Sequence, residues 1–127
     1  MATCVLDASA ILAMIKAEPG WDKVAAALPG AAISTVNVAE VFAKLADWKV
    51  PNEEHAKYRA VLEAAFVAFD GDQALCSAAL RQLTRSGGLS LGDRACLALA
   101  QSLGVPAITA DKAWTGVNCG IKIEVIR

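Results

Sequence analysis

Histidine is nearly absent from this sequence, which excludes several familiar kinds of catalysis. Among 127 residues there is one histidine, His55. Ribonuclease chemistry that uses a pair of histidines is therefore not possible, and a Ser-His-Asp triad would depend on this single residue. Three charged residues surround His55 in the sequence, Glu53, Glu54 and Lys57. They predict that His55 lies on a solvated helix face rather than in a reaction centre.

Cysteine pairs and nucleotide-binding motifs are missing as well. The four cysteines lie far apart and form no C-x-x-C pair: Cys4, Cys76, Cys96 and Cys119. This spacing argues against a zinc site or a disulfide framework and indicates a reducing cytoplasm. There is also no G-x-S-x-G, G-x-x-x-x-G-K-[ST] or G-x-G-x-x-G motif. The α/β-hydrolase elbow and the common nucleotide-binding loops therefore lose support.

The sequence has no convincing membrane segment or secretory leader. The longest uncharged runs, residues 24–39 and 95–110, have 16 residues each and contain both proline and glycine. A membrane-spanning helix needs about 20 mostly apolar residues, so neither run is expected to cross a bilayer. The first 15 residues carry Asp7 and no Lys or Arg, unlike a secretory leader. We therefore expect a cytoplasmic protein with no membrane association.

What the sequence does contain predicts one α/β domain covering residues 1–127. The length fits a single domain, and 27 of the 71 apolar residues are alanine, which favours close-packed helices. We expect strands at residues 3–6, 32–34, 67–69, 107–109 and 121–126, and helices at 9–17, 22–28, 36–49, 53–65, 73–85 and 91–103. Asn52, Asp72 and Ser90 are expected to cap three of these helices. The alternation predicts a three-layer α/β/α sandwich with a five-stranded parallel sheet.

Four acidic residues fall where a sheet of this kind binds its ligands. In parallel α/β sheets, ligands bind beyond the carboxyl ends of the strands, where the strand order reverses. Asp7 and Asp111 follow the first and fourth expected strands, while Glu40 and Asp93 lie early in two of the expected helices. All four acids are therefore expected to project from the same edge of the sheet.

Each of these acids also has a purely structural explanation. Asp7 can cap a helix, Asp111 suits a turn, and Asp93 has capping-box spacing with the serine three residues before it. Glu40 lies opposite the apolar stripe of its expected helix and can pair with Lys44. Taken one at a time, the acids do not decide between structure and function.

Taken together, the four acids indicate a divalent metal site. Crowded carboxylates repel one another, and their pKa values rise unless a cation neutralises them. Mg²⁺ is typically held by a few carboxylates and retains several waters. Sites of this kind hydrolyse phosphodiesters, because the ion lowers the pKa of a bound water and stabilises charge on the leaving oxygen.

Four sequence blocks follow one another over nearly the whole chain: VLDASAILA, ISTVNVAEVFAKL, GLSLGDRACLALA and AITADKAW. In sequence and order they resemble the signature blocks of the PIN-domain family, and most of all its VapC-type toxin ribonucleases of type II toxin–antitoxin systems. The resemblance implies a metal-dependent endoribonuclease that cleaves single-stranded or looped RNA and leaves 5′-phosphate and 3′-hydroxyl ends. It also implies a cognate antitoxin partner and a homodimer.

The resemblance also implies which residues act. The family's acidic positions fall on Asp7, Glu40, Asp93 and Asp111, which would hold one or two Mg²⁺ or Mn²⁺ ions. It implies that two hydroxyl residues beside these acids orient them, namely Ser9 and Thr109.

Two positions within the resemblance stay open. Asn37 matches the second block, although a helix-start role explains it equally well. PIN domains often carry a further Asp or Asn after the fourth acid, and here the nearest such residue is Asn118. This departure leaves the presence of a second metal ion open.

Two other functions compete with a nuclease. A non-catalytic PIN-like module would bind RNA or a protein without cleaving it. A signalling receiver domain would use Asp70 as its phosphoacceptor and Lys112 as its assisting lysine, but receivers need adjacent acids after the first strand, and here Ala8 follows Asp7. The complete set of four acids favours the nuclease over both.

The charge balance is compatible with RNA as a partner. The chain has 12 Lys and Arg against 13 Asp and Glu, for a net charge of −1. If the four acids occupy one pocket, nine acids face 12 bases elsewhere, so the remaining surface is about +3. Arg94 and Lys112 adjoin the acids and are candidate contacts to RNA phosphates.

The three tryptophans are candidate anchors of a protein interface, with core packing as the alternative: Trp21, Trp48 and Trp114.

Overall fold

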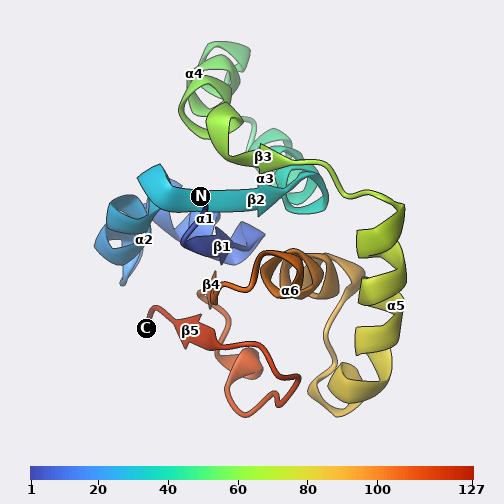
Figure 1. The fold of residues 1–127 in the computed structure, drawn as a ribbon. Helices are drawn as coiled ribbons and strands as arrows, with labels where there is room; N and C mark the ends of the chain where they lie inside the picture. The colour runs from blue at the N-terminus through green and yellow to red at the C-terminus, as the bar shows by residue number, and fades with distance from the viewer.

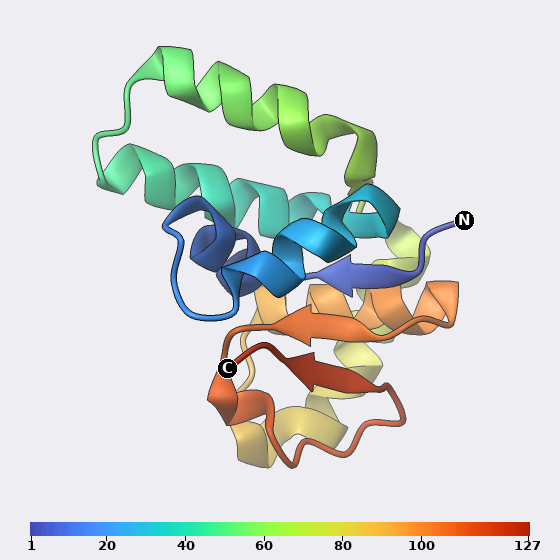
Figure 2. The same ribbon diagram turned by 90° about the vertical axis from the view of Figure 1, so that its left-hand side faces the viewer.

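Five parallel strands form the centre of the molecule in a computed structural model that describes residues 1–127 (Figure 1). The strand order is β3-β2-β1-β4-β5, so the order reverses between β1 and β4. The strands are β1 (Cys4–Leu6), β2 (Ala31–Ser34), β3 (Phe66–Val67), β4 (Ala107–Thr109) and β5 (Ile123–Val125). Figure 2 shows β1, β4 and β5 side by side with their arrows pointing the same way. The predicted five-stranded parallel sheet is confirmed.

Six α-helices connect and cover these strands. They are α1 (Ala8–Ile15), α2 (Trp21–Ala27), α3 (Thr35–Asp47), α4 (Asn52–Leu62), α5 (Gly71–Thr84) and α6 (Leu91–Leu103). Four single 3₁₀ turns complete the chain: η1 (Leu28–Gly30), η2 (Glu63–Ala65), η3 (Arg85–Gly87) and η4 (Lys112–Trp114). None of the helices combines the length and the apolar run that a bilayer crossing requires.

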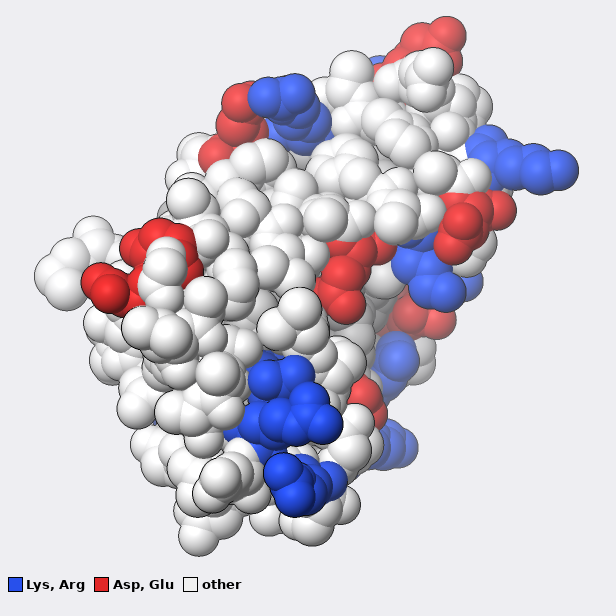
Figure 3. All heavy atoms as spheres, turned by 90° about the vertical axis from the view of Figure 1, so that its right-hand side faces the viewer, with Lys and Arg blue, Asp and Glu red and all other residues white.

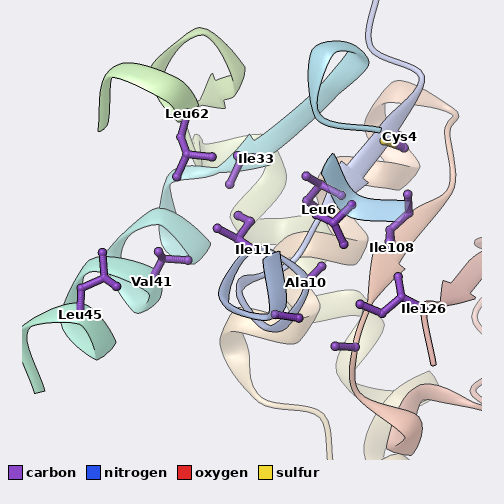
Figure 4. Close-up of a cluster of buried hydrophobic side chains, with 13 residues drawn as sticks. Cys4, Leu6, Ala10, Ile11, Ile33, Val41, Leu45, Leu62, Ile108 and Ile126 are labelled. Atoms are coloured by element: carbon purple, nitrogen blue, oxygen red, sulfur yellow. The ribbon is translucent and has the colours of Figure 1, made fainter. Parts of the chain in front are cut away.

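Alternate residues along each strand enter two separate cores, which gives the three-layer sandwich. Leu6, Ile33 and Ile108 belong to a core on the side of α1 and α3, where Ile11 of α1 meets them (Figure 4). Their strand neighbours enter a second core on the side of α6: Val5, Ala32 and Ala107. Because side chains alternate with a period of two, a strand buried on both faces needs apolar residues throughout.

Two predicted helix caps are wrong. α4 begins at Asn52 itself, and Pro51 occupies the cap position because its fixed φ suits the entry to a helix. In α5 the cap is Asp70, whose Oδ1 accepts the N–H of Gln73 at 2.9 Å, while Asp72 lies within the first turn. Ser90 does cap α6, as predicted.

α4 lies outside the three layers and pairs with α3 as a helical hairpin (Figure 2). Leu62 is its one buried residue. His55 of α4 is half-buried, with its ring centroid 5.9 Å from that of Phe42 and a buried Nε2 that has no hydrogen-bond partner. The prediction of a solvated face for His55 is therefore wrong, because the α3–α4 contact partly covers the ring.

The tryptophans and cysteines have distinct surroundings. Trp114 is 1% exposed and belongs to the second core, so core packing is the correct alternative for it. Trp21 and Trp48 are 45% and 40% exposed, and Lys16 Nζ lies 4.6 Å from the centre of the Trp48 ring. All four cysteines are free thiols.

Candidate active site

Asp7 and Asp111 lie on the two sides of the point where the strand order reverses. Asp7 directly follows β1, and its N–H donates to the carbonyl of Ile108 in β4 at 3.1 Å. Asp111 comes two residues after the end of β4. The carboxyl ends of these neighbouring strands therefore place both acids at the same edge of the sheet, where parallel sheets bind ligands.

The Asp7 carboxylate is buried within a shell of hydrogen-bond donors. It is 3% exposed. Its Oδ1 accepts the N–H of Ala10 at 2.8 Å, so Asp7 does cap α1. The Ser9 hydroxyl lies 2.8 and 2.9 Å from the two carboxylate oxygens, and Thr109 Oγ1 donates to Oδ2 at 2.5 Å. The structural explanation for Asp7 is thus correct, but a cap alone does not require this degree of burial.

Burial raises the pKa of Asp7 to about 6, from an ordinary value of 3.8. Hydrogen bonds from Thr109, Ala10 and Ser9 lower the pKa, and the charge of Asp93 raises it further. No lysine or arginine compensates this charge, since the three ion pairs of the molecule involve other acids, namely Glu63, Glu124 and Glu18. Above pH 6 the fold therefore holds a buried negative charge without a cation beside it.

Ser9 and Thr109 link Asp7 to the backbone that leads to Asp111. Ser9 Oγ accepts the N–H of Ala110 at 2.9 Å and lies 3.0 Å from Thr109 Oγ1. Thr109 Oγ1 accepts the N–H of Asp111 at 3.0 Å. Each hydroxyl thus binds Asp7 and a main-chain N–H together, which fixes the side chain relative to the loop after β4.

Asp93 lies in the first turn of α6 and forms a reciprocal capping box with Ser90. Its N–H donates to Ser90 Oγ at 3.2 Å, and its Oδ2 accepts the N–H of Ser90 at 2.9 Å. The other oxygen, Oδ1, accepts no hydrogen bond from the protein. One carboxylate oxygen therefore serves the helix while the second is available to a ligand.

Glu40 is held by a buried amide from its own helix. Asn37 Nδ2 donates to Glu40 Oε1 at 2.8 Å and to the carbonyl of Gly92 in α6 at 3.0 Å. The helix-start explanation for Asn37 is wrong, because Ser34 occupies the cap of α3 and accepts the N–H of Val36. Glu40 also makes no ion pair with Lys44.

The charges of three of the four acids act on one buried thiol, Cys96 of α6. Burial raises the pKa of Cys96 well above its usual value, and the charges of Asp7, Asp93 and Glu40 raise it further. Asp111 is exposed, and its Oδ1 accepts the N–H of Ala113 at the start of η4. Asp7, Asp93 and Glu40 thus lie within electrostatic range of the same thiol, whereas Asp111 is exposed after β4, at the sheet edge that also carries Asp7.

The four acids do not form a preformed metal cage. No group of three or more His, Cys, Asp or Glu side chains lies close enough together to enclose one ion. The donor set nevertheless fits a hard divalent cation, because it consists of carboxylate oxygens and includes the buried, uncompensated Asp7. Mg²⁺ keeps several waters and needs only one or two direct carboxylates, so it does not require a closed cage.

The polar residues near the acids differ in whether their side chains bind other parts of the protein or are exposed. Arg94 Nη1 donates to the carbonyl of Ser77 at 3.2 Å, so this side chain packs between α5 and α6. Lys112 is exposed in η4 beside Asp111. Asn118 lines a cavity of about 500 Å³ between the end of α5 and the loop after η4, and none of the four acids lines that cavity.

The topology removes the receiver alternative. Asp70 follows β3, an edge strand that β2 and β1 separate from β4. Lys112 follows β4, so the two residues belong to strands that are three places apart in the sheet. Asp70 instead caps α5.

Sequence reasoning missed the part played by Gly92. Its carbonyl binds Asn37, and a Cβ at this position would overlap the Glu40 carboxylate. The available signal was a glycine inside a helix, which is unfavourable unless close packing requires it.

Known proteins share this fold. The family model for the PIN domain matches residues 4–118. A toxin–antitoxin complex from Klebsiella pneumoniae superposes with a TM-score of 0.78 at 22% identity, covering 98% of each chain. DNA-bound VapBC from Salmonella typhimurium superposes with a TM-score of 0.78 at 16% identity, covering 100% of both chains. VapBC-5 from Mycobacterium tuberculosis superposes with a TM-score of 0.62 at 23% identity, covering 100% of this chain and 99% of that one.

These structures share the fold, while no curated protein sequence matches the chain. The family match covers most of the sequence, from β1 to the loop before β5. It includes all four acids and both of the hydroxyl residues that contact Asp7. On this match, the chain belongs to the PIN domain family.

Proposed function

We propose that residues 1–127 form a single nuclease domain, a Mg²⁺- or Mn²⁺-dependent endoribonuclease that acts as the toxin of a toxin–antitoxin pair. The observation that carries the proposal is the buried carboxylate of Asp7 at the strand-order reversal. It has neighbouring acidic charges and no cationic partner. A buried charge of this kind is costly unless a cation binds beside it.

In this proposal the four acids hold the metal and the substrate is single-stranded or looped RNA. Asp7, Asp93 and Asp111 bind one or two ions, and Glu40 binds an ion or orients the attacking water. When bound, the ion supplies an activated water and stabilises charge on the leaving oxygen. Hydrolysis leaves a 5′-phosphate and a 3′-hydroxyl.

The chain's own residues fix the acids for this task. Donation by Thr109 and Ser9 favours the ionised form of Asp7, which is the form that binds a cation. The Ser90 N–H holds one oxygen of Asp93. The exposed Lys112 is the cation best placed to contact an RNA phosphate, because Arg94 already binds the α5 backbone.

The partner proposal rests on the structural neighbours. The Klebsiella pneumoniae structure is a toxin–antitoxin complex, and the Salmonella typhimurium one is VapBC bound to DNA. We propose that this chain likewise binds an antitoxin, forms a homodimer and acts in the cytoplasm, where its four free thiols stay reduced. Trp21 and Trp48 are the exposed aromatic residues available as interface anchors.

The products of cleavage test the reaction type. A panel of short structured RNAs is incubated with the protein and Mn²⁺, and the fragments are analysed by mass spectrometry. The proposal expects a 5′-phosphate on every downstream fragment. Fragments that end in a 2′,3′-cyclic phosphate would contradict it, because they arise from attack by the RNA's own hydroxyl.

One observation favours a second function, a PIN-like module that binds RNA or a protein without cleaving it. The acids do not enclose a ready-made ion site. Calorimetric titration with Mn²⁺ separates the two functions, because the nuclease requires binding that Asp7→Asn weakens by at least tenfold. If the parent protein binds no Mn²⁺, the binding module becomes the better account.

A further inference from the structure

We propose that Asn37 and Gly92 are positioning residues that hold the Glu40 carboxylate against the first turn of α6. The inference rests on the proposed nuclease function and concerns how one acid reaches its working position. Glu40 belongs to α3, whereas Asp93 belongs to α6. The contact among Asn37, Glu40 and Gly92 joins these two helices beside the candidate active site.

The buried side-chain amide of Asn37 acts here only as a hydrogen-bond donor. It is 1% exposed, and its two acceptors are Glu40 Oε1 at 2.8 Å and the carbonyl of Gly92 at 3.0 Å. Both acceptors require the NH₂ group, so the orientation of the amide is fixed, and the buried Oδ1 has no hydrogen-bond partner. An apolar side chain would avoid this unsatisfied oxygen, so retaining an amide here serves the contact with Glu40.

Gly92 provides the space that the Glu40 carboxylate occupies. A Cβ built on Gly92 would overlap both carboxylate oxygens of Glu40. Gly92 lies in the first turn of α6, where its backbone has an ordinary helical conformation that alanine also adopts. Glycine is therefore required by the approach of Glu40 rather than by the backbone.

The resulting position suits a carboxylate that works with Asp93. The N-terminus of a helix carries partial positive charge, which attracts the Glu40 carboxylate to the first turn of α6. Glu40 is otherwise exposed and makes no ion pair, so nothing else restrains its rotamers. Asn37 and Gly92 thus set where Glu40 stands relative to Asp93, the next residue along α6.

Gly92→Ala tests the inference directly, with Gly71→Ala as its matched control. Both glycines lie in the first turn of a helix, but a Cβ on Gly71 meets nothing within 4 Å. Gly92→Ala should lower Mn²⁺ affinity and RNA cleavage about 10- to 100-fold, the usual effect of losing a group that orients a metal ligand. Its melting temperature should match that of the control, because alanine favours helix in both. Parent-level cleavage by Gly92→Ala would overturn the inference.

A double variant distinguishes positioning from a general structural effect. If Gly92 acts only through Glu40, then adding Gly92→Ala to Glu40→Ala should cause no further loss of cleavage. Independent losses that multiply would show that Gly92 acts by another route. Asn37→Asp should behave like Gly92→Ala, because it sets a carboxylate against two acceptors.

A measurement that needs neither metal nor activity keeps this inference separate from the proposed function. The side-chain amide protons of Asn37 should exchange slowly with solvent in the parent protein, as measured by NMR. Their exchange should be at least tenfold faster in Gly92→Ala, and their exchange rate in Gly71→Ala should equal that of the parent. No cleavage by the parent would contradict the proposed function, whereas equal exchange in parent and Gly92→Ala would overturn the positioning role.

Discussion

The Asp7 carboxylate caps α1 and also lies within electrostatic range of Asp93. The cap was readable from the sequence, since an aspartate before a helix is an ordinary N-cap. The burial was not, because it depends on β4 bringing Thr109 against the carboxylate from 102 residues away. Asn37 shows the same limit, since its spacing to Glu40 is local but its second partner, Gly92, lies 55 residues away.

The raised pKa of Asp7 predicts how stability depends on pH. Between pH 3.8 and about 6 the folded state binds more protons at Asp7 than the unfolded state. The free energy of unfolding therefore falls as the pH rises through this window, by up to about 3 kcal/mol, and stays low above pH 6. Asp7→Asn removes this penalty, so in chelator the variant should gain stability over the parent as the pH rises.

Urea unfolding of both proteins from pH 4 to pH 8 measures this difference. Asp47→Asn, at an exposed acid near the end of α3, is the control and should follow the parent. Parallel pH profiles for the parent and Asp7→Asn would contradict the burial argument.

Thr109→Val tests the hydroxyl that donates to Asp7. Without this donor the pKa of Asp7 should rise further, because the bond favours the ionised form. Mn²⁺ affinity at pH 7 should then fall by about tenfold. Calorimetry measures the change, and Thr115→Val, at an exposed threonine, should bind Mn²⁺ like the parent. Equal Mn²⁺ affinities for Thr109→Val and Thr115→Val would contradict a role for Thr109 in metal binding.

Among the elements, α6 was the easiest to predict and α4 and β3 the hardest. Residues 91–103 were expected and observed, because Ser90 opens the helix and Gly104, with φ of 67°, closes it. β3 has two residues and lies at the edge of the sheet, where few contacts define its ends. α4 contributes one buried residue, so its sequence carries little apolar pattern.

The cap of α6 has a functional consequence that the cap of α5 lacks. Ser90→Ala and Asp70→Ala each remove a side chain that accepts a helix N–H, so each should cost about 1 kcal/mol of stability. Only Ser90→Ala disturbs the turn that holds Asp93. We expect chemical denaturation to show similar losses, and RNA cleavage to fall only in Ser90→Ala. Equal cleavage by both variants would show that the capping box serves the helix alone.

At the scale of the whole molecule, the alternation of short apolar strands with helices along the chain predicted the parallel sheet and the helices on both of its faces. The placement of Asp7, Asp93 and Glu40 within electrostatic range of Cys96 depends on the strand order as well, which local patterns do not contain. On the face that Figure 3 displays, basic and acidic side chains form small groups, several of which adjoin one another.

This mixed surface predicts weak salt dependence of RNA binding. If bound metal neutralises the four acids, the remaining surface is about +3 and few phosphates are neutralised, so the slope of log K against log [salt] should be shallower than about −3. Fluorescence anisotropy with Asp93→Asn, which should bind without cleaving, measures the slope. A slope steeper than about −5 would require a basic groove that the charge balance does not provide.

The most direct test of the central claim is cleavage of structured RNAs by the parent protein with Mg²⁺, with a chelator, and by Asp93→Asn with Mg²⁺. The carboxylates at the strand-order reversal predict cleavage in the first reaction and none above background in the other two. Cleavage that persists in the chelator, or full activity of Asp93→Asn, would contradict metal-dependent hydrolysis at this site.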